Sequence, residues 1–314
     1  MDYIYVLAGL LLLFAGGEGL VRGSVAVAEK LKVSKLLIGM AVVGFGTSAP
    51  ELMVSVQAAL NGQPAVAVGN VVGSNIANML LIGGVAMLLA PLAADDKAVL
   101  RDGWVMVLVT LLILAQGVYG GVIGRTEGAL MVAVLACYLA YAYRSERKRA
   151  LADLKLEEEV LPIGKASLGF SLFAVAGGLL MLVLGADLLV EGAVNIAKGF
   201  GVSEAVIGLT LVAVGTSLPE LAATLVAAWK KHNEVILGNI IGSNIFNVLS
   251  ILGITAMVKP VPLDNRFVVQ DIPFALLVSV AMVWLIGLTG KLNRTAGVLF
   301  MLAYVGYMAL LFSV

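Results

Sequence analysis

The sequence has few charged residues and few of the side chains that soft metals prefer. Only 13% of its 314 residues are Asp, Glu, Lys or Arg, compared with about 25% in a typical soluble domain. Its 20 basic and 20 acidic residues cancel, which argues against a nucleic-acid partner. A single cysteine excludes an intrachain disulfide, and with a single histidine it leaves too few sulfur and nitrogen ligands for zinc or copper.

The chain instead contains apolar runs that are long enough to span a membrane. Hydrophobic residues make up 61% of the chain, and a transmembrane helix needs about 20 of them in sequence. The chain therefore predicts an all-α membrane protein with ten transmembrane helices. We expect these spans near residues 3–29, 35–61, 65–91, 100–119, 126–143, 167–197, 204–229, 234–257, 270–289 and 293–313. We expect no cleavable signal peptide, because the first run contains Glu18 and Arg22 and lacks a basic leader.

Two sequence phrases occur twice, in the same order. GTSAPEL at Gly46–Leu52 precedes GNVVGSNIAN at Gly69–Asn78, and GTSLPEL at Gly215–Leu221 precedes GNIIGSNIFN at Gly238–Asn247. A spacing of 169 residues relates both pairs without a gap. Ungapped recurrence of G-T-S-x-P-E and G-S-N-I-x-N is not expected by chance, so the chain contains an internal duplication.

The duplication divides the chain into two halves of opposite orientation. We expect a five-span repeat over residues 1–145, a cytoplasmic linker over 146–165 and a second five-span repeat over 166–314. Of the basic residues, 15 fall in loops on one side of the predicted membrane and four on the other. The basic side is expected to be cytoplasmic, so both termini lie outside. Because five is odd, the second repeat enters the membrane inverted.

The GTSxPE phrase is expected to break a helix at the membrane midplane. Gly46 favours a left-handed, helix-ending conformation, and Pro50 suits the first turn of a following helix. Irregular backbone at this depth is tolerated only where it is buried or lines a cavity, and paired helix breaks indicate the binding site of a transporter. A carboxylate in hydrocarbon costs several kcal/mol and marks ion or proton handling. We therefore expect broken helices 2, 3, 7 and 8 around an ion site that contains Glu51 and Glu220.

The GSNIxN phrase adds oxygen ligands from the following span. Ser74 and Asn78 are four residues apart and share a helix face, as do Ser243 and Asn247. The other asparagines of these phrases serve equally well as ligands or as helix–helix hydrogen-bond donors; they are Asn70, Asn75, Asn239 and Asn244. Carboxylate, carbonyl, hydroxyl and amide oxygens suit hard cations such as calcium and sodium.

At these residues the sequence resembles the cation/calcium exchanger superfamily, in particular its prokaryotic sodium/calcium antiporters. The resemblance covers nearly the whole chain and implies that Glu51 and Glu220 are the principal calcium ligands. It implies that the backbone carbonyls of Thr47 and Thr216 complete the calcium site. It further implies flanking sodium sites and neutral oxygens beside the centre, which are assigned to Ser48, Ser74, Ser217, Ser243, Asn78 and Asn247.

The resemblance also implies the mode of transport. Spans one and six would slide against the rest of the protein, and three sodium ions would exchange for one calcium ion, so that transport is electrogenic. In potassium-dependent relatives and certain prokaryotic members the position of Asn247 is an aspartate, and the asparagine here argues against potassium co-transport. The transported ions are calcium and sodium, with no cofactor and no enzymatic activity, in a multi-pass protein of the cytoplasmic membrane that can act as a monomer.

Two points stay open on the sequence alone. A calcium/proton antiporter would use the same scaffold, because carboxylates also carry protons. An ion channel or an intramembrane acid protease fits less well, since the acids occur with hydroxyl and amide donors in duplicate. Glu18 and Arg22, four residues apart in span one, can pair on one helix face. Such a pair would either stabilise the span or take part in its movement.

Overall fold

The computed structural model describes residues 2–94, 97–154, 167–200 and 215–313. The first half contains α1 (Asp2–Leu31), α2 (Lys35–Ile38), the π-helix η1 (Gly39–Gly44), α3 (Phe45–Thr47), α4 (Ala49–Leu60), α5 (Pro64–Ala77), the π-helix η2 (Asn78–Ile82), α6 (Gly83–Leu89), β1 (Leu92–Ala93), α7 (Lys97–Tyr119), β2 (Val122–Ile123) and α8 (Arg125–Leu154). The second half contains α9 (Leu168–Gly199), α12 (Leu218–Trp229), α13 (Asn233–Phe246), the π-helix η4 (Asn247–Leu252), α14 (Gly253–Val258), β3 (Val261–Pro262), the π-helix η5 (Phe267–Asp271), α15 (Ile272–Thr289), β4 (Lys291–Leu292) and α16 (Arg294–Ser313).

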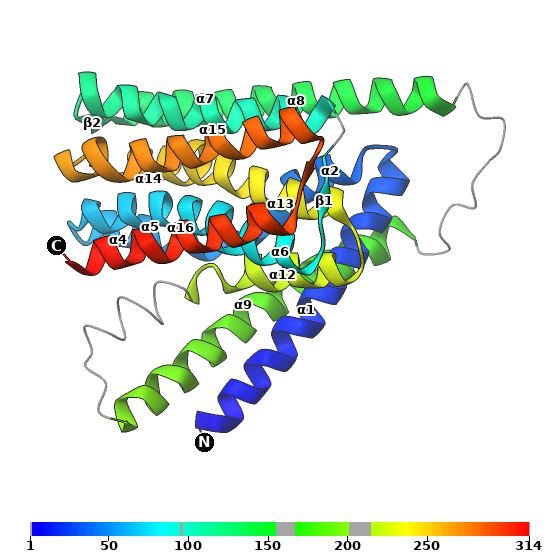
Figure 1. The fold of residues 1–314 in the computed structure, drawn as a ribbon, viewed down its shortest axis with the longest axis horizontal. Coiled ribbons are helices and arrows are strands. Elements are labelled where there is room, and N and C mark those ends of the chain that lie inside the picture. The colour runs from blue at the N-terminus through cyan, green and yellow to red at the C-terminus, as the bar shows by residue number, and fades with distance from the viewer. Residues whose placement is uncertain (1, 95–96, 155–166, 201–214, 314) are drawn as a thin grey trace.

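The described elements form a helical bundle of membrane-spanning dimensions. Eight helices are long and apolar enough to cross a membrane, and the bent pair Lys35–Thr47 and Ala49–Leu60 makes a ninth span within the described part of the chain. The apolar helix α12 has 12 residues. The first part of the predicted span 204–229, residues 204–214, lies outside the described residues. Figure 1 shows most helices running side by side, while α1 and α9 form a separate pair that crosses the bundle obliquely.

The spacing of 169 residues seen in the motifs extends to the structural elements. Helix α4 begins at Ala49 and α12 at Leu218, and both have 12 residues. The short strands follow the same rule, because β1 and β3 start at Leu92 and Val261, and β2 and β4 at Val122 and Lys291. Strand β1 pairs with β4, and β2 pairs with β3. Each pairing therefore joins the two halves. The two pairings are equivalent, because β3 and β4 occupy in the second half the positions that β1 and β2 occupy in the first.

Glycines at seven-residue intervals allow α1 and α9 to pack closely. They are Gly9, Gly16 and Gly23 on α1 and Gly178, Gly185 and Gly192 on α9, again 169 residues apart. A Cβ atom on Gly16 would lie 2.8 Å from the carbonyl oxygen of Gly178. Small residues of this kind let helix backbones approach in a membrane, where the hydrophobic effect does not drive helices together. The two helices are antiparallel, because Gly9 faces Gly185 and Gly16 faces Gly178.

The helix break in the first GTSxPE phrase falls at Ser48. Ser48 has φ −81° and ψ 9°, and the helix axis bends by 44° between α3 and α4. The expectation that Gly46 adopts a left-handed conformation is wrong: Gly46 lies within α3, and the described glycines with positive φ are Gly62, Gly121 and Gly290. Pro50 occupies the first turn of α4 as expected, where its missing N–H is harmless.

The third and eighth predicted spans are continuous rather than broken. Residues 64–89 and 233–258 each form one uninterrupted helical span. Each contains a π-helical segment, and the two segments start at Asn78 and Asn247. A π-helical segment inserts extra backbone into a helix and often occurs at functional sites. The irregularity predicted for these spans is therefore present, but as a local widening of the helix.

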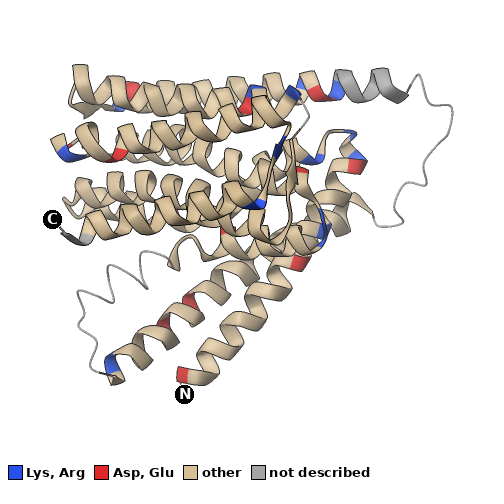
Figure 2. Cartoon of the chain, in the orientation of Figure 1, with Lys and Arg blue, Asp and Glu red and all other residues tan. Residues whose placement is uncertain are grey.

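Charged residues lie mainly at the helix ends. Figure 2 shows long stretches of helix without charge, and basic residues gathered chiefly toward the right of the view, away from both chain termini. Helix α8 continues through residues 146–154, the first part of the predicted linker, and residues 155–165 of that linker lie outside the described residues.

Replacing Gly16 with alanine tests the glycine contact. We expect Gly16→Ala to destabilise the purified protein by about 1–3 kcal/mol, since the added methyl group overpacks the α1–α9 contact. The measurement is the thermal unfolding of the protein in detergent. Gly177→Ala is the matched control, because a Cβ atom there meets nothing within 4 Å. Equal stability of the two variants would contradict this packing.

Candidate ion-binding site

Glu51 and Glu220 are buried at equivalent positions of the two halves. Each lies in the first turn of its helix, Glu51 in α4 after the break at Ser48 and Glu220 in α12 after Ser217. Both side chains are 1% exposed, so water does not solvate their charge. The amino-terminal end of a helix carries partial positive charge and stabilises a carboxylate in its first turn. This stabilisation is smaller than the cost of burying an ionised carboxylate, so each group needs either a counter-cation or a proton.

Serine side chains link the two halves across the site. The Ser48 hydroxyl donates to Glu220 Oε1 at 3.0 Å, although 172 residues separate them. The Ser217 hydroxyl lies 3.5 Å from Glu51 Oε1 in the equivalent arrangement. Each carboxylate is therefore contacted by the serine that precedes the other. These crossed contacts bring the two GTSxPE phrases into a single site.

Several oxygen atoms in this region are buried without a hydrogen-bond partner. Among the described residues they include Oε2 of Glu51 and of Glu220 and Oδ1 of Asn78 and of Asn247. Buried polar atoms are normally satisfied, and an unpaired one costs about 1–3 kcal/mol. The four atoms come from equivalent positions in the two halves, and all are acceptors. Coordination to a cation is one way to satisfy such acceptors.

Two asparagines form hydrogen bonds with the helices that carry the glutamates. Asn70 Nδ2 donates to the carbonyl oxygen of Glu51 at 3.0 Å and to the Ser55 hydroxyl at 2.9 Å. In the second half, Asn239 Nδ2 donates to the carbonyl oxygen of Glu220 at 3.3 Å and to the Thr224 hydroxyl at 3.0 Å. Asn70 and Asn239 thus act as helix–helix hydrogen-bond donors, one of the two roles left open for them.

The remaining asparagines connect the two π-helical spans. Asn75 Nδ2 donates to the carbonyl oxygen of Asn244 at 3.2 Å, and Asn247 Nδ2 donates to Asn75 Oδ1 at 2.9 Å. Asn244 Nδ2 donates to the carbonyl oxygen of Ile240 in its own helix. These bonds use the amide nitrogens of Asn75 and Asn247, and they leave Asn247 Oδ1 unpaired.

The other predicted ligands are buried or half-buried. Thr47 and Ser243 are fully buried, Ser74 is 6% exposed, and Thr216 is half-buried. The Thr47 hydroxyl donates to the carbonyl oxygen of Val43, four residues earlier. The Ser243 hydroxyl donates to the carbonyl oxygen of Gly44 in the opposite half. Hydrogen bonds therefore link predicted ligands of spans 2, 7 and 8 across the two halves.

This set of donors suits a hard cation. It contains two carboxylates with hydroxyl and amide oxygens, the ligand types that calcium accepts. Within the described residues, no three or more His, Cys, Asp and Glu side chains gather where they could hold a metal ion. The site therefore offers two negative charges and several neutral oxygens, in a location shielded from water.

Sequence reasoning missed further polar contacts that connect the helices. Glu18 pairs with Arg22 as expected, and also with Lys230 of the opposite half, at 2.8 Å. Tyr138 donates to Asp102 at 2.7 Å and Tyr307 donates to Asp271 at 2.9 Å. Both tyrosines and both aspartates obey the 169-residue spacing. Extending the internal alignment beyond the two phrases would have identified these pairs.

The fold defines a helical, multi-pass membrane protein, in which the two halves contribute equivalent buried acidic, hydroxyl and amide side chains. The sequence profile described as sodium/calcium exchanger protein matches residues 1–144 and 170–313, and the chain belongs to that family.

Named relatives and solved structures agree with this assignment. The chain is 38% identical to the putative antiporter CaxA of Alkalimonas amylolytica, covering 99% of this chain and 98% of that protein. It is 30% identical to the sodium/calcium exchanger MaX1 of Methanosarcina acetivorans, covering 100% and 99%. The structure of the sodium-calcium exchanger NCX_Mj soaked with Na⁺ and Sr²⁺ matches with a TM-score of 0.84 at 30% identity, covering 98% and 97%.

Replacing Asn70 or Asn239 with alanine tests whether its hydrogen bonds stabilise the helix that carries the glutamate. We expect Asn70→Ala and Asn239→Ala to lower the free energy of unfolding by about 1–3 kcal/mol each, because each leaves buried partners unsatisfied. The measurement is thermal unfolding in cation-free buffer. Asn61→Ala serves as the control, since its hydrogen bond to Gln57 is exposed. If Asn70→Ala or Asn239→Ala were as stable as Asn61→Ala, the stabilising role of its hydrogen bonds would be contradicted.

Proposed function

We propose that this protein exchanges sodium for calcium across a membrane at the site formed by Glu51 and Glu220. The observation that carries the proposal is the set of buried, unpaired oxygens contributed equally by the two halves. The principal calcium ligands are the two glutamates, with the carbonyl oxygens of Thr47 and Thr216. The neutral groups that complete the calcium and sodium sites are Ser48, Ser74, Asn78, Ser217, Ser243 and Asn247.

Charge balance supports antiport over uptake of one ion alone. Two ionised glutamates carry a charge of −2, which one Ca²⁺ or two Na⁺ neutralise. A third Na⁺ at the serine-rich positions would leave one positive charge, so exchange of three sodium ions for one calcium ion moves net charge. The site without ions keeps two unbalanced buried charges, whose burial is costly. That cost disfavours switching of the empty protein and couples the two ion flows. The protein acts as a transporter of calcium and sodium and not as an enzyme.

The proposed architecture has ten spans in two inverted repeats. The paired strands β1–β4 and β2–β3 support this, because exchanging the halves converts one pairing into the other. Helix α12 belongs to the predicted span 204–229, of which residues 204–214 lie outside the described residues. The basic loops would face the cytoplasm, and both termini would lie outside, in a chain that can act as a monomer in the bilayer of the cytoplasmic membrane.

Alternating access is proposed to arise from movement of the α1–α9 pair. The pair crosses the bundle obliquely (Figure 1), and the close glycine contact would let the two helices move as one unit. Glu18 would join this unit to the rest of the protein, because it pairs with Lys230 at the end of α12. A crosslink between α1 and α12 that leaves ion binding intact but abolishes exchange would support movement of the pair over a purely stabilising role for Glu18.

Calcium/proton exchange is the alternative on the same scaffold. The unpaired Oε2 atoms of Glu51 and Glu220 could carry protons in place of sodium ions. The two functions differ in the gradient that drives calcium movement.

Reconstituted protein provides the test. We expect a sodium gradient to drive ⁴⁵Ca²⁺ uptake into proteoliposomes with an accompanying current. Glu51→Gln and Glu220→Gln should each abolish uptake, because each removes one of the two charges that balance calcium. The control is Glu29→Gln, an exposed acid near the end of α1.

The result that would reject sodium coupling is uptake driven by a pH gradient and indifferent to sodium. Electroneutral exchange would reject the ratio of three to one. Retained uptake in both Glu51→Gln and Glu220→Gln would show that these two glutamates do not form the calcium site.

A further inference from the structure

An ion pair joins the end of α12 to the middle of α1. Lys230 Nζ lies 2.8 Å from Glu18 Oε1, and the Arg22 guanidinium pairs with the same oxygen. The Glu18 and Lys230 side chains are only 23% and 28% exposed. Charges that are partly removed from solvent are screened less than exposed ones, so this pair can bias how α1 sits on α12.

Apolar contacts continue the same line between the two helices. A Cβ atom on Gly17 would lie 2.9 Å from a methyl carbon of Val226, and the Phe14 and Trp229 rings have centroids 5.6 Å apart. We call this line of contacts between α1 and α12 the inner seam, because Lys230 belongs to the basic side that is proposed to face the cytoplasm.

The equivalent position at the other end of the protein carries different charges. The spacing of 169 residues relates Glu18 to Asp187 of α9. It also relates Arg22 to Glu191, and Lys230 to Asn61 at the end of α4. The inner seam therefore has one acid between two cations, whereas the equivalent outer positions have two acids and an amide.

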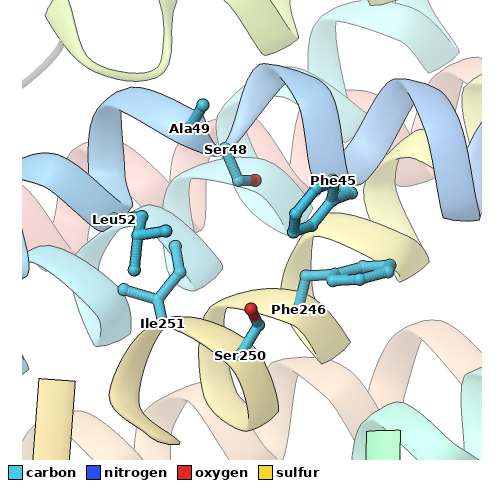
Figure 3. A pocket seen from close by; sticks show the side chains of 7 residues that line it. All are labelled: Phe45, Ser48, Ala49, Leu52, Phe246, Ser250 and Ile251. Atoms are coloured by element: carbon cyan, nitrogen blue, oxygen red, sulfur yellow. The ribbon is translucent and has the colours of Figure 1, made fainter. Parts of the chain in front are cut away.

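Within the described residues, α9 and α4 are not packed as α1 and α12 are. Met53 of α4 is 73% exposed, although its equivalent Ala222 is partly buried against α1. Figure 1 shows the carboxyl-terminal end of α9 well apart from α4. Helix α4 faces span 8 instead, and Figure 3 shows Leu52 turned toward Ile251 of η4 across a small, mainly apolar cavity. The structure thus has a closed inner seam without a closed outer counterpart.

Movement of the α1–α9 pair would exchange these two arrangements. In an inverted-repeat transporter one end closes as the other opens, so closure of the outer seam would bring Asp187 toward Asn61. An amide can donate a hydrogen bond to that carboxylate, but it does not balance the charge. The ion pair of the inner seam is broken in this movement and has no charged equivalent to replace it. The two end positions of the α1–α9 pair are therefore unequal in free energy.

We propose that Lys230 is a positioning residue that, through Glu18, holds the α1–α9 pair in the position with the inner seam closed. It would thereby set the fraction of the protein whose ion site opens to the outer side. The inference rests on the proposed exchange function and on the proposed movement of the α1–α9 pair. Lys230 lies among none of the ion ligands proposed above, so it acts on the equilibrium between the two positions and not on ion binding itself.

A distance measurement across the outer seam tests the proposal. Spin labels at Gln63→Cys and Phe200→Cys, in a Cys137→Ala background, would report the separation of the outer ends of α4 and α9; both sites are exposed. Double electron–electron resonance in sodium-containing proteoliposomes should give mainly the longer distance for wild type. We expect Lys230→Gln to raise the ratio of the shorter to the longer distance about two- to fivefold, the effect of one partly exposed ion pair. Lys230→Arg, which keeps the charge, should stay close to wild type.

A second variant adds the missing charge at the outer seam. Asn61→Lys should raise the same ratio, because its ammonium group can pair with Asp187 when that seam closes. This variant gives up only an exposed hydrogen bond with Gln57, so its folding is not at risk. Lys231→Gln is the matched control and should leave the ratio unchanged, because Lys231 is the exposed neighbour of Lys230.

An unchanged ratio in Lys230→Gln, or an equal rise in Lys230→Gln and Lys230→Arg, would overturn the proposal. If Lys230→Gln did not fold, the absence of any rise in Asn61→Lys would overturn it instead. Failure of the exchange function is distinct, because wild-type proteoliposomes would then show no sodium-driven ⁴⁵Ca²⁺ uptake. The distances report the position of the α1–α9 pair whichever ions the protein carries.

Discussion

Burial of two carboxylates in a water-excluded bundle is the constraint on which the rest of this structure depends. Glu51 and Glu220 are each 1% exposed, and in such surroundings an ionised carboxylate requires a partner. The protein supplies neutral donors to one oxygen of each group, through Ser48 and Ser217. It leaves the second oxygen of each unpaired. In the proposed function a bound cation completes the balance, which would link the stability of the site to its occupancy.

Duplication explains how one chain builds such a site. The glutamates, serines and asparagines recur with a spacing of 169 residues, and so do the packing glycines and the strand pairs. Contacts across the site join residues of opposite halves, as the pair Ser48–Glu220 shows. Equivalent contacts on both sides leave the two ends of the bundle similar, which suits a transporter that exposes one site to either face. The equivalence is incomplete, because Lys230 pairs with Glu18 whereas Asn61 occupies the position equivalent to Lys230.

The sequence predicted that the two GTSxPE phrases lie together, because acids in apolar spans are costly and recur here at a fixed spacing, and the hydrogen bonds between the phrases confirm this. The role of these residues as ion ligands stays a prediction. The sequence also predicted the helix start at Pro50 and the pairing of Glu18 with Arg22. It placed the backbone distortion wrongly at Gly46, since the conformation of that turn depends on how Ser48 reaches Glu220 in the other half. The π-helical segments at Asn78 and Asn247 were also beyond prediction. They depend on tertiary packing between spans, which local sequence does not encode.

The central claim is that Glu51 and Glu220 form one divalent site and not two. Counting bound calcium by equilibrium dialysis of purified protein in sodium-free buffer tests it most directly. The account predicts one high-affinity Ca²⁺ per chain in wild type, and loss of that ion in Glu51→Gln and equally in Glu220→Gln. Two ions per chain in wild type, with one retained in each variant, would contradict it.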